Sequence, residues 1–199
     1  MHITQAPQKT IRLSTAAASL PALFWPVVRT VAASLLVAAC AHITLPLFLT
    51  PVPFTLQPLA VLLVALLLPR REAFAALSLY LLEGAAGLPV FTPTGPGGLA
   101  QLIGPTGGYL IAYPAIAALA SSLYRLGKPS FGRGVLAAGI ANLVLLSAGA
   151  AWFAMITHAS LGVVASATIL PFLPGDAVKV FAAAGIASSW TSLRGRFQK

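Results

Sequence analysis

The sequence predicts an all-α integral membrane protein with six transmembrane helices, and three observations lead to that class. Of its 199 residues, 58% are hydrophobic and 8% are charged, with a mean hydropathy of +0.92. This composition is typical of a membrane protein and not of a soluble domain. The apolar runs are long enough to cross a bilayer, which takes about 20 residues each. Basic residues gather in the short segments that join these runs.

Proline, glycine and charged residues mark the ends of the apolar runs. Glu72 suits the start of a helix, because a carboxylate there faces the positive end of the helix dipole. A weaker apolar stretch follows the fifth run as far as Leu173. We expect six spans, at about residues 26–47, 54–68, 72–88, 107–123, 135–156 and 174–193.

The basic residues also indicate how the chain is oriented in the membrane. Eleven of the 12 Lys and Arg residues lie on one side of a six-span arrangement, namely Lys9, Arg12, Arg29, Arg70, Arg71, Arg125, Lys128, Arg133, Arg194, Arg196 and Lys199. By the positive-inside rule that side is the cytoplasm, so both termini are cytoplasmic in a multi-pass protein of the cell membrane. Because these residues are spread over four segments and form no single patch, we expect no nucleic-acid partner.

This orientation divides the chain into three parts. Residues 1–24 form a cytoplasmic tail, since they lack the continuous apolar core and cleavage site of a signal peptide. Residues 25–194 form the six-helix membrane domain, with a substrate pocket at its outer side. Residues 195–199 form a short second cytoplasmic tail.

The segment 84–109 is the least helical part of the membrane domain. Eight of its 26 residues are Gly, four are Pro and none is charged, so it cannot form one continuous helix. Irregular backbone at membrane depth persists only where protein buries it or where it lines a cavity. The segment is therefore either a surface loop between two helices or a folded wall that holds a small molecule.

The twelfth cation, Lys179, lies at the outer end of the sixth span, against the positive-inside rule. Asp176 precedes it by three residues, which puts both side chains on one helical face. Either Lys179 reaches the lipid headgroups beside an N-capping Asp176, or the two residues face a cavity. In the second case they form one outer pocket with segment 84–109, suited to an anionic ligand. Glu83, the other acid at this depth, caps the Gly84 turn or reaches Lys179 or the ligand.

Four motifs, in this order and spacing, resemble the BioY family. They are VPFTLQ (52–57), GAAGLPVF (84–91), GPTGGY (104–109) and PFLPGDAVK (171–179), and the resemblance covers about residues 29–193. BioY proteins are the biotin-binding S components of energy-coupling factor (ECF) transporters. The resemblance implies the six-helix S-component fold in a lipid bilayer, with biotin held near the outer face. It also implies partners, namely the transmembrane coupling subunit and the ATPase subunits of an ECF module.

The resemblance further implies which residues meet biotin. Asp176 and Lys179 match the aspartate and lysine that contact the ligand in the family, and residues 91–98 match its binding lid. After Phe91 this lid reads TPTGPGG, where we expect a plainer Gly/Ala/Asn-type loop, so Thr92 or Thr94 is the candidate for the polar contact of the lid. Lys179 would pair with the biotin carboxylate, and Asp176 would accept ureido N–H bonds or orient Lys179. An apolar pocket with few polar groups suits such a ligand.

Four further residues complete the predicted site with weaker support. Gln57 and Thr106 would bind the ligand or satisfy irregular backbone, and Phe91 and Tyr109 would pack on the biotin bicycle or within the helix bundle. The full predicted site is Lys179, Asp176, Phe91, Thr92, Thr94, Gly98, Gln57, Thr106, Tyr109 and Glu83.

Small residues recur every four positions on the first span, at Thr30, Ser34 and Ala38. Such a stripe lets another helix approach closely. The neighbouring helix belongs either to this protein or to the coupling subunit, which in the family docks on an alanine-based stripe of the first helix. Ser34 departs from strict alanine.

The predicted function is capture of biotin for an energising module. The alternative is a self-sufficient secondary transporter of a small organic anion. Internal repeats would support this alternative, and the sequence contains no convincing repeat. We expect no enzyme, because the few ionisable residues form no catalytic constellation. We also expect no cofactor and no metal, since the His residues at 2, 42 and 158 lie far apart with no carboxylate at ligand spacing.

Overall fold

The computed structural model describes residues 20–48 and 50–197. This part of the chain is almost entirely helical, apart from one short antiparallel ribbon and the connecting segments. Its elements in order are α1 (Leu20–Ala41), β1 (Thr44–Leu45), β2 (Phe54–Thr55), α2 (Gln57–Leu67), α3 (Arg70–Ala85), α4 (Gly98–Ile103), α5 (Gly107–Arg125), α6 (Phe131–Thr157), α7 (Leu161–Thr168) and α8 (Leu173–Phe197).

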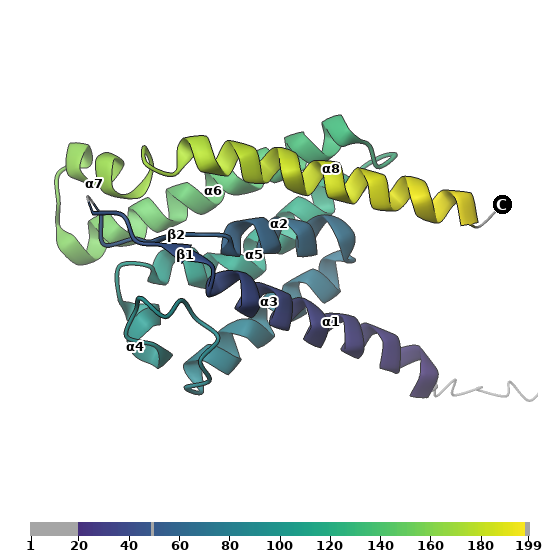
Figure 1. Ribbon diagram of the computed structural model, residues 1–199, viewed down its shortest axis with the longest axis horizontal. Coiled ribbons are helices and arrows are strands. Elements are labelled where there is room, and N and C mark those ends of the chain that lie inside the picture. The colour runs from purple at the N-terminus through teal and green to yellow at the C-terminus, as the bar shows by residue number, and fades with distance from the viewer. Residues whose placement is uncertain (1–19, 49, 198–199) are drawn as a thin grey trace, which may run out of the picture.

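The helices form a bundle with two distinct ends (Figure 1). The first turn of α1 and the last turn of α8 lie at one end, whereas the β1–β2 ribbon, α4 and α7 gather at the other. Within the bundle α5 packs against both α3 and α6, α8 packs against α6 and α2, and α1 packs against α3 and α2. The shorter, irregular elements are thereby concentrated at the end opposite to these two helix ends.

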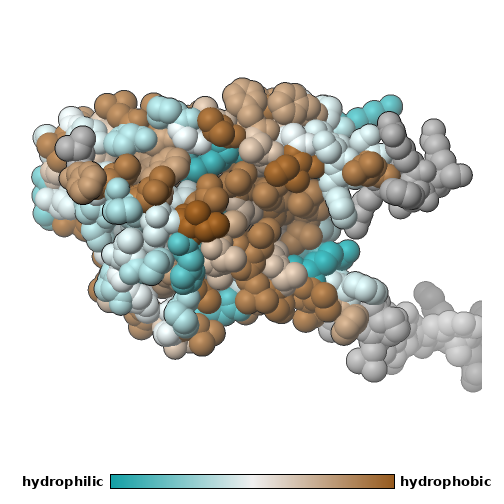
Figure 2. Space-filling view, viewed as in Figure 1, coloured by the Kyte–Doolittle hydropathy of each residue, from teal (hydrophilic) through white to brown (hydrophobic). Residues whose placement is uncertain are grey.

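Small side chains let these helices approach one another closely. Alanines such as Ala65, Ala76, Ala120, Ala138 and Ala183 are fully buried in the shared core. Small residues at the contact are how helices pack in membranes, where the hydrophobic effect does not drive them together. Large apolar side chains instead point outward on several helices, and Figure 2 shows hydrophobic residues gathered over the middle of the molecule. A lipid-facing surface accounts for this inversion of the usual pattern.

The helices include segments of membrane-spanning length. By length and composition, residues Phe24–Ala41 of α1 and the whole of α6 could each cross a bilayer. Helix α7 and residues Leu173–Leu193 of α8 together make a third candidate, bent by 46° at the break between them. The chain is thus a mostly helical membrane protein. Helices α1, α2, α3, α5, α6 and α8 lie near the positions of the six predicted spans, although α2 and α3, with 11 and 16 residues, are shorter than the candidates above.

The predicted spans differ from the helices at several ends. The first was expected to reach residue 47, yet α1 ends at Ala41, because Thr44 and Leu45 pair with Thr55 and Phe54 in the ribbon. The same pairing delays the second helix, which begins at Gln57 and not at residue 54. The stretch after the fifth span contains a separate helix, α7. Segment 84–109 is not one helix, as expected, although it includes the short helix α4.

An ion pair holds the first and third helices together at the end opposite the ribbon. Helix α3 begins at Arg70, two residues before the predicted start, and Glu72 lies in its first turn. Arg29 of α1 donates to both carboxylate oxygens of Glu72, from Nε and Nη2, each at 2.8 Å. Such a two-pronged contact fixes the orientation of both side chains. Glu72 therefore joins two helices in addition to lying at a helix N-terminus.

Candidate functional site

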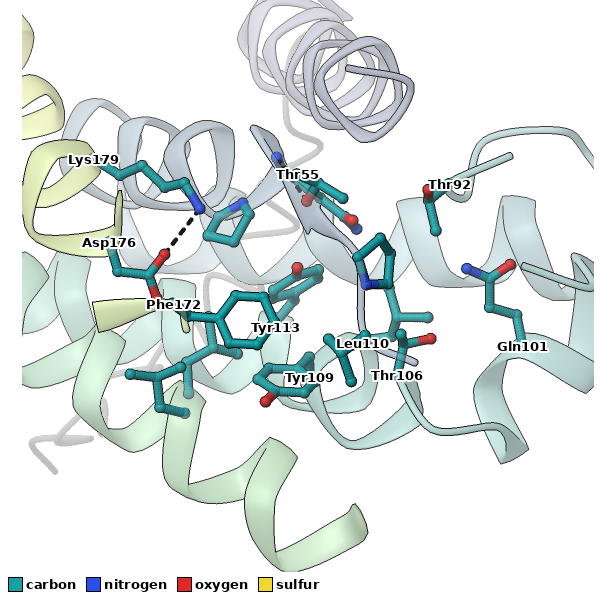
Figure 3. A pocket seen from close by; sticks show the side chains of 16 residues that line it. Thr55, Thr92, Gln101, Thr106, Tyr109, Leu110, Tyr113, Phe172, Asp176 and Lys179 are labelled. Carbon is teal, nitrogen blue, oxygen red and sulfur yellow. Dashed lines mark hydrogen bonds and ion pairs between the residues drawn. The ribbon is translucent and has the colours of Figure 1, made fainter. Parts of the chain in front are cut away.

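A cavity of about 50 Å³ lies at the end of the bundle that carries the ribbon and α4. Its walls come from the segment before α2, from α2, α5, α6 and α8, and from segment 84–109. Figure 3 shows Lys179 and Asp176 at one end of this cavity and Thr92 and Gln101 at the other. Aromatic and aliphatic side chains line the space between them, among them Tyr109, Tyr113, Leu145 and Phe172. The cavity is therefore apolar in the middle and polar at both ends.

The charged end is a buried ion pair on the first turns of α8. Lys179 Nζ donates to Asp176 Oδ1 at 2.8 Å, and each side chain is only 5% exposed. The ammonium also lies 3.9 Å from the centroid of the Phe54 ring, in cation–π contact. Burying two charges is costly unless each finds a partner, so this pair is stable only as a unit. The structure confirms that the two residues share a helical face and line one cavity.

Asn142 of α6 completes the charged end, and the sequence did not single it out. Its Nδ2 donates to Asp176 Oδ2 at 3.2 Å, so both oxygens of the carboxylate have donors. Its own Oδ1 is buried without a hydrogen-bond partner among the described residues. The sequence does mark Asn142 as unusual, because it is the single asparagine and lies within an apolar run. Polar residues inside spans usually face a partner or a cavity.

Gln101 of α4 forms the opposite, uncharged end of the cavity, and it too was missed. The side chain is 2% exposed, and its Oε1 accepts a hydrogen bond from the backbone N–H of Gly97 at 3.1 Å. Gly97, which donates this hydrogen bond, has φ 70°, a left-handed backbone conformation that favours glycine. With Oε1 held by the loop, the amide nitrogen points toward the cavity (Figure 3). Gln101 was recognisable as the one amide side chain in segment 84–109.

Two of the predicted lid residues have different positions from those expected. Thr92 lines the cavity, whereas Thr94 is exposed and lies outside the lining, with its Oγ1 3.1 Å from that of Thr92. Gly98 begins α4 and is not part of the lining. Of the two threonines considered, only Thr92 therefore faces the space where a ligand would lie.

Phe91 anchors the lid to α3 and does not line the cavity. Its ring lies where a side chain on Gly84 would be, since a Cβ there would come within 2.1 Å of it. The ring also meets Tyr80 edge to face, with 5.3 Å between centroids. Of the two alternatives for Phe91, packing within the helix bundle therefore holds, because the absent side chain of Gly84 leaves space for the ring.

Tyr80 connects this anchor to the cavity wall. Its hydroxyl donates to the backbone oxygen of Val90 at 3.1 Å and accepts from Gln57 Nε2 at 2.8 Å. Gln57 lines the cavity, although its amide nitrogen donates to the Tyr80 hydroxyl. Thr106 and Tyr109 line the cavity as well, and the Tyr109 hydroxyl donates to the backbone oxygen of Thr168 at 2.6 Å.

Glu83 lies outside the cavity and does not reach Lys179. Its carboxylate accepts a hydrogen bond from the Ser34 hydroxyl, which joins α3 to α1. Ser34 and Ala38 are 0% and 8% exposed, and Thr30 is partly buried. The small-residue stripe on α1 therefore faces the interior of this protein, so Ser34 and Ala38 are not available to another subunit.

The arrangement suits a small molecule with polar groups at both ends. Lys179 can meet an anionic group, the amide nitrogen of Gln101 can donate to an acceptor, and the aromatic walls suit an apolar body. Within residues 20–48 and 50–197, no three His, Cys, Asp or Glu side chains lie together as a metal site would need.

Comparison with known proteins identifies the family. The BioY family profile matches residues 12–196. The chain belongs to the BioY family. Two curated BioY relatives are similar over most of their length. The biotin transporter BioY2 of Lactococcus lactis subsp. cremoris is 34% identical, over 72% of this chain and 78% of that protein. The biotin transporter BioY of Thermotoga maritima is 37% identical, over 76% of this chain and 87% of that protein.

A solved structure shares the fold of this BioY chain. It is the crystal structure of the S-component for biotin from an ECF-type ABC transporter, which superposes with a TM-score of 0.79. The superposition covers 88% of this chain and 95% of that chain, at 21% sequence identity. The helical architecture is therefore that of an S component.

Proposed function

We propose that this BioY-family chain binds biotin in the cavity and acts as the S component of an ECF-type ABC transporter. The curated relatives from Lactococcus and Thermotoga are named biotin transporters, and the solved protein with this fold is an S-component for biotin. The observation that carries the proposal is the buried Lys179–Asp176 pair, which places an ammonium group at one end of an apolar cavity. The chain belongs to a transporter family and not to an enzyme family.

The two polar ends of the cavity suggest how biotin lies in it. The carboxylate would pair with Lys179, and Asp176, whose two oxygens already have donors, would orient that ammonium. The ureido group would then lie at the opposite end, where Gln101 and Thr92 offer an amide N–H group and a hydroxyl. The bicycle would rest between them against Tyr109, Tyr113 and Phe172.

The size of the cavity implies that the lid moves when biotin enters. A volume of about 50 Å³ is small beside the roughly 300–1,000 Å³ of typical ligand sites. The helices that form the other walls are packed against one another, whereas the lid (residues 91–98) is irregular and exposed at Pro93, Thr94 and Pro96. The lid is therefore the wall that withdraws.

The orientation in the membrane is part of the same proposal. We expect α1, α2, α3, α5, α6 and α8 to be the six spans of a membrane domain at residues 25–194, with both termini in the cytoplasm. The arrangement in Figure 1 supports this, because the first turn of α1 and the last turn of α8 both lie at the end of the bundle opposite the ribbon and α4. In a Cys40→Ala background, a cysteine at position 94 should be labelled only from outside and one at position 128 only from inside. Labelling of both from one side would contradict the orientation.

Calorimetry or native mass spectrometry of the purified protein tests the ligand. We expect one biotin per chain, with no binding of nicotinate as a control carboxylate. Absence of biotin binding by the folded protein would overturn the proposed function. Uptake by cells with and without an ECF module tests the partners, namely the coupling subunit and the ATPase subunits. Uptake by this chain alone would instead favour a self-sufficient secondary transporter.

A further inference from the structure

A second hollow, separate from the ligand cavity, lies on the surface between α3 and α5. It measures about 800 Å³ and is open along one side. Its lining comes from the first turns of α3 and from the second half of α5: Arg70, Arg71, Phe74, Ala115, Ala118, Leu119 and Ser122. We refer to it as the α3–α5 groove. It shares no lining residue with the ligand cavity.

The two arginines of the α3–α5 groove have no counter-ion among residues 20–48 and 50–197. Both are exposed, and neither makes an ion pair or a side-chain hydrogen bond within the described part of the chain. The sequence contains only three acidic residues, and each already has another partner. Glu72 pairs with Arg29, Glu83 accepts from Ser34, and Asp176 pairs with Lys179. Among the described residues, no acidic side chain is therefore left to neutralise Arg70 and Arg71.

The rest of the α3–α5 groove is apolar. Phe74 is 49% exposed at its edge, and small or aliphatic residues of α5 form its floor. The polar atom of Ser122 is already satisfied, because its Oγ donates to the backbone oxygen of Ala118 at 2.7 Å. A basic mouth leading into an apolar channel matches a molecule with an anionic head and a hydrocarbon tail. A free phosphate would use only the mouth of the groove.

We propose that the α3–α5 groove binds one anionic phospholipid. The phosphate of the headgroup lies at Arg70 and Arg71, and an acyl chain runs along Phe74, Ala115 and Leu119. In the orientation proposed above, the N-terminal end of α3 faces the cytoplasmic leaflet, which is the leaflet rich in anionic lipids. Each arginine contributes roughly a fivefold gain in affinity, the usual effect of one basic residue near an anionic bilayer surface. Biotin binding is not required for this site.

Native mass spectrometry in detergent can test the site by titration with phosphatidylglycerol or with phosphatidylcholine that has the same acyl chains. We expect one phosphatidylglycerol to be retained at concentrations where phosphatidylcholine is not. Arg70→Gln and Arg71→Gln should each weaken retention about fivefold. Lys128→Gln is the matched control, because it removes one exposed cation that lines neither hollow, and it should leave retention unchanged.

Two further measurements separate a lipid site from other anion sites. Ala118→Trp, with Ala118→Leu as a milder version, fills the groove without changing its charge and should also weaken retention. Soluble glycerol phosphate should compete poorly, because it lacks the acyl chain. Size-exclusion profiles and biotin binding like those of the wild type show that each variant is folded.

Several outcomes would overturn the lipid assignment. An equal loss with Lys128→Gln would indicate diffuse attraction to the surface. Competition by glycerol phosphate at the same concentration as lipid, with no effect of Ala118→Trp, would indicate a phosphate site only. Unchanged lipid retention in the arginine variants, together with loss of co-purification with an ECF module, would assign the arginines to a protein partner.

Discussion

The most direct test of the proposed binding mode is the substitution Lys179→Ala. In the structure Lys179 Nζ lies 2.8 Å from Asp176 Oδ1, and at this distance the attraction is about 6 kcal/mol for an effective dielectric constant of about 20. Desolvation offsets part of this gain. Truncating one partner of a buried charge pair typically costs about 2–5 kcal/mol. If the same ammonium also pairs with the biotin carboxylate, its loss should weaken binding by roughly 30- to several-thousand-fold.

The same substitution also destabilises the protein, so a second variant is needed to separate the two effects. Lys179→Ala leaves the Asp176 carboxylate buried with only Asn142 as a donor. In the double variant Lys179→Ala/Asp176→Asn the uncompensated charge is gone. We expect the double variant to recover thermal stability in detergent without recovering tight biotin binding, because the cation for the ligand is still missing.

Calorimetry with biotin and with biotin methyl ester then tests the carboxylate contact from the side of the ligand. The wild type should bind biotin more tightly than the ester, which has no charge to pair, and Lys179→Ala should narrow that difference. An exposed lysine would contribute less than about 1 kcal/mol. If Lys179→Ala weakens both ligands equally, Lys179 holds the fold or Asp176 in place, and the assignment of the carboxylate to it is wrong.

Three further predictions test separate parts of the site and of the partner surface. Asn142→Ala should lower stability by about 1.5–3 kcal/mol, because a buried carboxylate loses a donor, and an unchanged melting temperature would contradict this. Gln101→Leu should weaken biotin binding roughly 3- to 10-fold while Thr94→Ala has no effect, and the reverse order in calorimetry would reassign the lid contact. If a coupling subunit docks on the face of α1 that this chain leaves exposed, Ala32→Trp on that face should abolish co-purification and leave biotin binding intact. Ser34→Trp should instead prevent folding, because that side chain is fully buried.

The sequence was sufficient to locate the six longer helices, but not the short helices α4 and α7 or the ribbon. The ribbon formed by Thr44–Leu45 and Phe54–Thr55 lies in stretches as hydrophobic as the helices beside it. Hydrophobic periodicity cannot separate a short buried strand from a helix end in such a run. The two prolines before Phe54 indicate that the chain turns or runs extended there, yet they do not show which residues pair.

In the candidate site, contacts between side chains of the same helix could be predicted from the sequence. Contacts between side chains of different helices could not. The spacing of Asp176 and Lys179 fixes a shared helical face, so their pairing followed from sequence alone. The burial of Phe91 depends on the space beside Gly84 on another helix, which no local pattern encodes. The small-residue stripe on α1 likewise predicted a close contact correctly, but not that the contact is with α3 of the same chain.

The chain is fixed to the helix bundle before and after the exposed part of the lid, so the lid is a suitable place for a fluorescent label. At its start the Phe91 ring packs against Tyr80, and after it the short helix α4 is followed by Gly104, whose backbone oxygen accepts from Trp152 Nε1 at 2.9 Å. Thr94 lies on the exposed part of the lid, and within the part of the chain that the structure describes its hydroxyl meets only that of Thr92. A dye attached to a cysteine at position 94 would move with the exposed part of the lid, while the fixed segments on either side keep their contacts with the helices. Changes in its emission would then follow occupation of the cavity, so the membrane domain would serve as a fluorescent vitamin sensor.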